Sequence, residues 1–203
     1  TMVRTLLASR VRAQMTYRGS MIADMVTQGA LILTEFLEMW ILLNHAPTLG
    51  GFSLGEVALV YFCANLGFAL ADLGGGSLDT MEDLVRAGKL EALLIRPTSL
   101  LLQMMTQELQ LRRVGRVVVG VIGYPLALAT VDIDWTWQRA IVAALAPIGG
   151  ALVYFSFLMG AGGFQMFVIG ARQACNAVTY GGKYAGAIPG GALFTPIRVF
   201  FTF

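Results

Sequence analysis

Polar side chains that could bind an ion or a polar ligand interrupt the first long apolar stretch of the sequence. They recur at offsets of 0, 4, 11 and 14 residues, which places them near one face of a helix. These residues are Asp24, Gln28, Glu35 and Glu38. An acidic side chain at the centre of a membrane helix costs about 2.5–3.5 kcal/mol on insertion scales, so we expect Glu35 to face protein rather than lipid.

A second apolar stretch carries Asn65 and Asp72 on one helical face, where they could meet the first stripe. One interpretation is the polar wall of a substrate path that attracts a cationic amphiphile. The residues of that wall would be Glu35, Glu38, Asn65 and Asp72. The other interpretation is structural: a hydrogen-bonded contact between subunits, or a protonated Glu35 against a neighbouring helix. We expect no basic residue near the midplane of the membrane to neutralise these carboxylates.

Few side chains of the sequence suit catalysis or metal binding. The single histidine, His45, has no set of partner ligands, and the two cysteines, Cys63 and Cys175, belong to no Cys/His cluster. No Ser/His/Asp or Cys/His arrangement can be assembled. A P-loop requires GxxxxGK[ST], and neither Lys89 nor Lys183 fits that spacing. We therefore expect no catalytic residue, no metal and no cofactor in this chain.

The composition is that of an integral membrane protein. Of 203 residues 57% are hydrophobic, the mean hydropathy is +0.71, and only 14 basic and 12 acidic residues are present. A soluble globule would have too little polar surface at this composition. The net charge of +2 and the lack of a basic patch interleaved with aromatics argue against a nucleic-acid partner. The expected surroundings are a lipid bilayer.

The hydropathy pattern predicts one all-α polytopic membrane domain, residues 1–203, with an N-terminal arm and about six spans. The basic arm at 1–18 suits an amphipathic helix in the inner membrane interface or a solvated helix. Arginines in this arm and basic residues within 81–116 predict that both regions, and the N-terminus, are cytoplasmic. The predicted spans cover 19–43, 57–78, 114–131, 139–168 and 174–187, and a last span begins at 199–203 and is cut off.

Residues 81–96 are predicted to form a short amphipathic helix on the cytoplasmic side. Thr80 and Asp83 resemble a capping box, and Glu82 and Arg86 can pair one helical turn apart. Such a helix could lie on the lipid surface. Its charges of both signs favour a protein partner, because lipid-seeking helices usually have a mostly basic polar face.

The run GKLEALLIRP at 88–97, the late FTPIRVFFTF at 194–203 and the order of apolar segments resemble the permease subunits of bacterial type-2 ABC transporters. Within that family the sequence is most similar to the subfamily with two different permeases and one ATPase. The resemblance implies a type-2 ABC exporter fold in the bacterial plasma (inner) membrane, with 81–96 as the coupling helix that docks on the ATPase. The residues it assigns to ATPase coupling are Met81, Glu82, Asp83, Leu84, Arg86, Gly88, Lys89, Glu91, Arg96 and Pro97.

The same resemblance implies ATP and Mg on a cytoplasmic ABC ATPase dimer, a second and non-identical permease subunit, and export of an amphiphilic or drug-like, cationic molecule. A lipid or glycan conjugate is the alternative cargo. A carboxylate-lined ion-coupled transporter or channel, with Glu35 and Asp72 as relays, is the rival class, although no inverted repeat of broken helices is visible. A membrane scaffold that binds a cytoplasmic protein is the third hypothesis.

Overall fold

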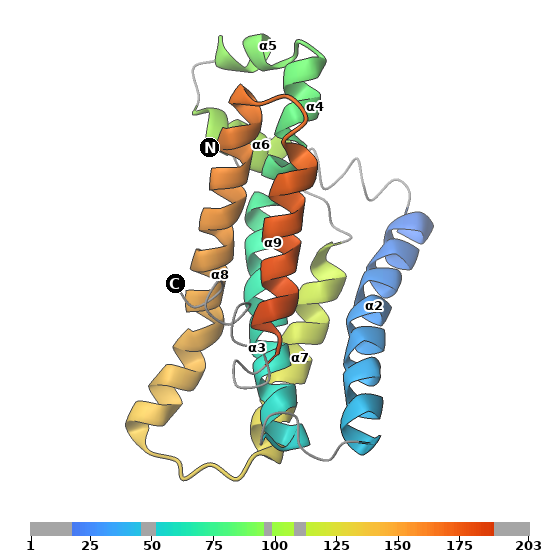
Figure 1. Cartoon of the computed structure of the whole chain (residues 1–203), viewed down its shortest axis with the longest axis vertical. Helices are drawn as coiled ribbons and strands as arrows, with labels where there is room; N and C mark the ends of the chain where they lie inside the picture. The colour runs from blue at the N-terminus through green and yellow to red at the C-terminus, as the bar shows by residue number, and fades with distance from the viewer. Residues whose placement is uncertain (1–17, 46–51, 96–98, 108–112, 189–203) are drawn as a thin grey trace.

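The structure is a computed structural model that describes residues 18–45, 52–95, 99–107 and 113–188. These residues form helices joined by short turns, and no strand occurs within the described ranges (Figure 1). The all-α fold class predicted from hydropathy is confirmed. The expectations for residues 1–17 of the arm, for Arg96 and Pro97, and for a last span at 199–203 lie outside the described residues.

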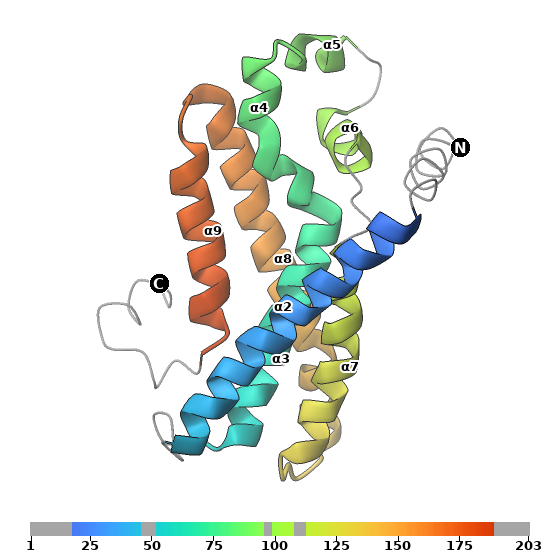
Figure 2. The same cartoon turned by 90° about the vertical axis from the view of Figure 1, so that its right-hand side faces the viewer.

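The longer described helices pack side by side as an up-and-down bundle (Figure 1). They are α2 (Arg18–His45), α3 (Leu54–Gly75), α7 (Val114–Thr130), α8 (Trp137–Phe167) and α9 (Arg172–Gly186). Helix α3 lies at the centre and contacts each of the other four. Helix α2 crosses α3 and α7 obliquely (Figure 2). The central position of α3 explains why so many of its side chains are buried.

Within the described ranges, three helical stretches are long and apolar enough to cross a bilayer: Arg18–Ile41, Leu54–Arg86 and Trp137–Phe167. Helix α3 alone, with 22 residues, is about 33 Å long and matches the ~30 Å hydrocarbon core. The part of the second stretch after Gly75 therefore extends beyond the membrane core. Helices α7 and α9 have 17 and 15 residues, short of the ~20 of a full crossing, so their role as spans stays a prediction.

Polar caps begin α3 and α8 at the end of the bundle that carries the α7–α8 turn. Ser53 forms a capping box with Glu56: the Ser53 amide donates to Glu56 Oε2 (2.8 Å), and the Glu56 amide donates to Ser53 Oγ (3.4 Å). Thr136 Oγ1 accepts from the Arg139 amide (3.4 Å) and caps α8. These caps fix where two membrane helices start.

Short helices gather at the opposite end of the bundle (Figures 1 and 2). They are η1 (Gly76–Thr80), α4 (Met81–Arg86), α5 (Leu90–Leu94) and α6 (Leu100–Gln107). Helix α4 packs against α8, and α6 packs against η1 and α3. Met81 and Leu93 are buried in an apolar cluster with Met104 of α6. The packing of these apolar side chains holds the short helices against the bundle, since none is long enough to be stable alone.

The single helix predicted over 81–96 is wrong: the segment forms α4 and α5 with a turn between them. Gly88 has φ +62° and ends α4. The Gly88 amide donates to Val85 O and the Lys89 amide to Leu84 O, each at 3.0 Å, which is a Schellman motif. The capping box predicted at Thr80 is also wrong, because the Thr80 hydroxyl donates to Ser77 O (2.9 Å) and α4 continues directly from η1.

Glycines bring the long helices close together at two crossings. A Cβ on Gly67 would lie 3.1 Å from the backbone of Gly150, where α3 meets α8. A Cβ on Gly115 would overlap the backbone carbonyl of Met25, where α7 meets α2. Backbones approach this closely in membranes because small residues replace side-chain bulk at the contact. The position of α2 and α7 therefore depends on Gly115.

Candidate functional site

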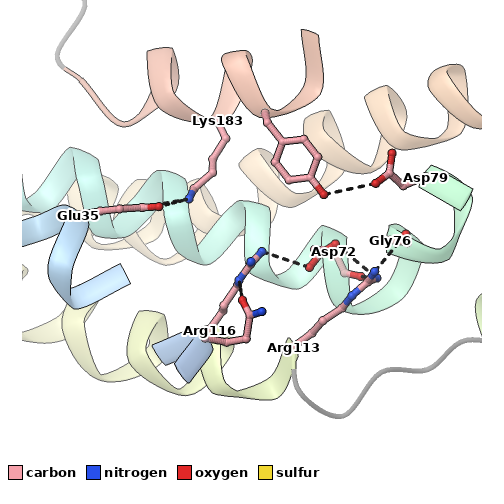
Figure 3. A network of polar contacts seen from close by, with 9 residues as sticks. Glu35, Asp72, Gly76, Asp79, Arg113, Arg116 and Lys183 are labelled. Carbon is pink, nitrogen blue, oxygen red and sulfur yellow. Dashed lines mark hydrogen bonds and ion pairs between the residues drawn. The ribbon is translucent and has the colours of Figure 1, made fainter. Parts of the chain in front are cut away.

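An ion pair joins α2 to α9 (Figure 3). Lys183 Nζ lies 3.0 Å from Glu35 Oε2 and 3.2 Å from Oε1. The Lys183 side chain is 8% exposed and that of Glu35 26%. A lysine this deeply buried needs an anionic partner, because an isolated charge in apolar surroundings is strongly destabilising. The contact is therefore a salt bridge that holds α2 and α9 together.

Aromatic residues surround this ion pair. The Tyr61 hydroxyl lies 2.8 Å from Ile32 O and 3.2 Å from Glu35 Oε2, and can donate to either oxygen. Lys183 Nζ lies 4.8 Å from the centre of the Tyr184 ring, within the range of a cation–π contact. Helix α3 thus contributes Tyr61 to a pair made by its two neighbours, so α2, α3 and α9 meet at one polar point.

A second charged group surrounds Asp72 near the carboxyl end of α3 (Figure 3). Arg113, the N-cap residue of α7, and Arg116 within α7 place Nη1 atoms 3.4 and 3.6 Å from the Asp72 carboxylate oxygens. Arg113 also donates to the backbone carbonyls of Asp72 (2.7 Å) and Gly76 (3.2 Å). Arg116 donates from Nε to Gln28 Oε1 of α2 at 2.6 Å. The guanidinium of Arg113 satisfies terminal carbonyls and lies at the negative end of the helix dipole.

The expectation that no basic residue neutralises the membrane carboxylates is wrong. Glu35 is paired with Lys183, and Asp72 with Arg113 and Arg116. The sequence pattern placed Lys183 in an outer segment and the two arginines in a cytoplasmic loop. The long side chains of these basic residues, which lie near helix ends, reach inward far enough to pair with the carboxylates.

The other two residues of the predicted substrate path, Asn65 and Glu38, are not partners in these ion pairs. Asn65 is 2% exposed and donates from Nδ2 to Tyr61 O of its own helix (3.0 Å). Glu38 is on the exposed side of α2. The role of these four polar residues in a substrate path stays a prediction.

At the end that carries α4, Glu82 joins the short helix to the α8–α9 turn. Its carboxylate accepts from the backbone amides of Gly170 (2.9 Å) and Arg172 (3.1 Å). It also accepts from Arg86 Nε at 2.7 Å, which confirms the predicted pair one turn apart. Arg172 in turn donates to Asp83 Oδ2 at 2.6 Å. Helix α4 is thus fastened to the turn by charge-assisted hydrogen bonds, which are stronger than neutral ones.

The ionisation of Glu82 follows from these contacts. Burial by itself raises the pKa of this carboxyl, but the amides of Arg172 and Gly170 and the Arg86 guanidinium together hold the pKa below its ordinary value. Gly170 has φ +93°, a conformation that favours glycine and turns its amide toward the carboxylate. Glu82 therefore stays ionised at neutral pH and keeps the turn in place.

The predicted coupling residues divide into buried and exposed sets. Met81 and Glu82 are 3% and 5% exposed and face the bundle, and Leu84 is half-buried. The exposed set is Asp83, Arg86, Gly88, Lys89 and Glu91. Sequence reasoning missed two further exposed residues, Leu94 and Ile95, which are 59% and 84% exposed. Their signal was an apolar pair just before an Arg-Pro break in an otherwise charged segment.

Among the described residues, no group of three or more His, Cys, Asp or Glu side chains lies together so that it could hold a metal ion. Cys63 and Cys175 are free thiols, half-buried and buried, on different helices. The polar groups described above instead connect helices to one another.

The family follows from comparison with known proteins. A family model described as ABC-2 family transporter protein matches residues 30–203. The chain belongs to this family. As an ABC-2 family member it is a membrane permease component of an ABC transporter, and it works with an ATPase component instead of carrying a catalytic site. No curated protein and no solved structure matches it.

Proposed function

We propose that this ABC-2 permease exports an amphiphilic or drug-like molecule from a bacterial cell across the plasma (inner) membrane. The driving reaction is ATP hydrolysis, with ATP and Mg on a cytoplasmic ABC ATPase dimer. A second, non-identical permease completes the transport path, and the N-terminus is cytoplasmic. The observation that carries this proposal is the fastening of α4 to the α8–α9 turn through Glu82.

The docking surface for the ATPase is the exposed side of α4 and α5. It consists of Arg86, Lys89, Glu91, Leu94 and Ile95. Charges of both signs beside exposed apolar residues suit a groove on a protein, where apolar residues fill the centre and charged pairs set the register. A lipid surface would favour a uniformly basic face instead.

Movement of this surface has a direct route into the bundle. Glu82 is bonded to Gly170 and Arg172, so a displacement of α4 pulls on the turn between α8 and α9. Helix α9 then carries Lys183, which is paired with Glu35 of α2. A push from the ATPase is thereby passed to helices on both sides of α3, which is what an alternating-access transporter requires.

The charge of the cargo is less restricted than the sequence alone suggested. Because Lys183 and the arginines of α7 neutralise Glu35 and Asp72, these carboxylates give little preference for a cation. Glu38 remains on the exposed side of α2, where a partner permease or the cargo would meet it. We therefore propose amphiphilic character, rather than positive charge, as the property that selects the cargo.

The test is co-purification of an ATPase with this chain after expression together with its genomic neighbours. The substitutions Ile95→Asp and Leu94→Asp should each weaken the affinity of the ATPase for this chain at least tenfold. The reason is that a buried charge at the centre of an interface costs several kcal/mol. Trp137→Asp, an equally exposed apolar residue at the opposite end of the bundle, is the matched control. The proposal fails if no ATPase co-purifies, or if the Leu94 and Ile95 variants retain it as the control does.

A further inference from the structure

A cavity of about 680 Å³ opens between α3, α7 and α8 toward the α7–α8 turn. Its volume lies within the range of about 300–1,000 Å³ that is typical of small-molecule sites. Small residues of α3 and α8 leave this room between the helices: Ala64, Ala143, Ala146 and Gly150. Val142 and Val153 also line the cavity and are 67% and 56% exposed, so it is open along one side.

The tyrosine hydroxyls on the wall of the cavity are already bonded to the backbone. Tyr124 OH donates to Ala143 O (2.8 Å), and Tyr154 OH lies 3.4 Å from Gly182 O. Most other side chains of the wall are aliphatic, among them Leu59, Val60 and Leu128. The deep part of the cavity therefore has an apolar surface that suits an alkyl chain.

The mouth of the cavity has a different chemistry. Arg139, Gln138 and Trp135 line it beside the α7–α8 turn. Arg139 Nη1 donates to Asp134 O (2.9 Å), and the Arg139 side chain remains 58% exposed. The Asp134 carboxylate lies 4.0 Å away and is fully exposed, so it is a weak competitor for the guanidinium. Arginine has five N–H donors and binds phosphate in a bidentate way.

The length of the cavity matches one leaflet. Arg139 and Gly150 both line it and are separated by about 17 Å along α8, at 1.5 Å per residue. Half of a ~30 Å hydrocarbon core is about 15 Å. An alkyl chain that starts below Arg139 can therefore run through its leaflet within the cavity. Trp135 lies at the mouth, as tryptophans do at the level of lipid headgroups.

We propose that this cavity binds a phospholipid, with the phosphate on Arg139 and one acyl chain along α8 as far as Gly150. The positive charge at the mouth and the apolar wall below it complement the two parts of such a lipid. The site lies at the end of the bundle opposite α4, in the outer leaflet on the orientation proposed above. It uses neither Glu35 nor the α4–α5 surface.

The experiment uses the full chain, with its co-expressed partners, in nanodiscs. The probe is a phosphatidylglycerol with a diazirine in the middle of one acyl chain, and the comparison probe is a diacylglycerol with the same chain. Photolabelled residues are located by mass spectrometry. The expected labels lie on Leu59, Val60, Ala143 and Ala146, and Arg139→Gln should weaken phosphatidylglycerol labelling roughly tenfold. Arg139→Lys keeps the positive charge but lacks the bidentate guanidinium geometry. Its phosphatidylglycerol labelling should lie between that of the unmodified protein and that of Arg139→Gln.

A matched pair of variants tests the cavity itself. Ala146→Phe fills it and should abolish labelling, whereas Ala144→Phe lies on an exposed part of α8 outside the cavity and should not. Thermal unfolding of each variant complex shows that the bundle is intact. The proposal is overturned if the diacylglycerol labels these residues as strongly as the phosphatidylglycerol does, if folded Ala146→Phe keeps the labels, or if a partner permease covers the cavity and excludes both probes.

Discussion

The ion pair between Lys183 and Glu35 joins residues that are 148 positions apart in the chain. Lys183→Met should lower the free energy of unfolding by about 1–3 kcal/mol, because it leaves the Glu35 carboxylate without its cation. The loss should be below that of a fully buried pair, since 26% of the Glu35 side chain is exposed. Thermal unfolding of the purified complex in detergent measures it.

The double replacement Lys183→Met with Glu35→Gln provides the control for this prediction. It should recover part of the stability, because no charge is then left unpaired in the bundle. The coupling energy from the four proteins of this cycle isolates the contact from the effects of each substitution alone. A double variant whose loss equals the sum of the two single losses would show that the charges do not stabilise each other.

At the scale of the elements, the crossing of α2 and α7 depends on Gly115. Gly115→Ala should lower the free energy of unfolding by about 1–3 kcal/mol, because the new methyl group overlaps the backbone carbonyl of Met25. Gly149→Ala is the matched control: it is also helical, but beyond the neighbouring backbone of its own helix no atom lies within 4 Å of its added Cβ. It should be neutral or slightly stabilising. Equal melting temperatures for the two variants would contradict the crossing.

The turn between α4 and α5 makes a separate prediction. Gly88→Ala should destabilise the turn by about 1 kcal/mol through its positive φ alone, since apart from its two chain neighbours no atom lies within 4 Å of the added Cβ. The chain then favours continuing α4, which would move α5 away from its place on the docking surface. Turnover of the co-purified ATPase should therefore fall. Gly88→Asn should be milder, because asparagine tolerates this conformation, and an Asn variant as impaired as the Ala variant would refute the argument.

At the scale of the whole molecule, we expect the Glu82→Gln variant to lose coupling between ATP hydrolysis and transport while it still binds the ATPase. Glu82→Gln removes the charge that holds the amides of Gly170 and Arg172, but the residue is buried and lies off the docking surface. The ATPase should still co-purify, while the dependence of its turnover on transported cargo should weaken severalfold. Asp132→Asn, which changes an exposed carboxylate in the α7–α8 turn at the opposite end of the bundle, is the control. Loss of the ATPase from the Glu82 variant would mean that Glu82 acts in docking instead.

Much of the fold could be predicted from the sequence, because long apolar runs leave a membrane chain few alternatives to helices. The stretches predicted at 57–78, 114–131 and 139–168 form helices at Leu54–Gly75, Val114–Thr130 and Trp137–Phe167. The pair of Glu82 with Arg86 was also predictable, because one helical turn sets its spacing. These features depend on residues close together in the sequence.

The charge partners and the break at Gly88 could not be predicted in this way. Periodicity places a side chain on a face of its own helix, but it does not say which distant helix lies opposite. Lys183 and Glu35, or Asp72 and the arginines of α7, meet only because α3 brings its neighbours together. The backbone bonds of the Schellman motif outweighed the amphipathic pattern of 81–96.

The sequence by itself thus determined the membrane class, the helical fold and the family motif, because hydropathy and local spacing act along the chain. Only the tertiary structure decided that the membrane carboxylates are neutralised, that Glu82 holds the α8–α9 turn, and that a cavity opens below Arg139. The physical reason is that charge pairing and packing voids are properties of helices in contact. Residues far apart in sequence determine them together.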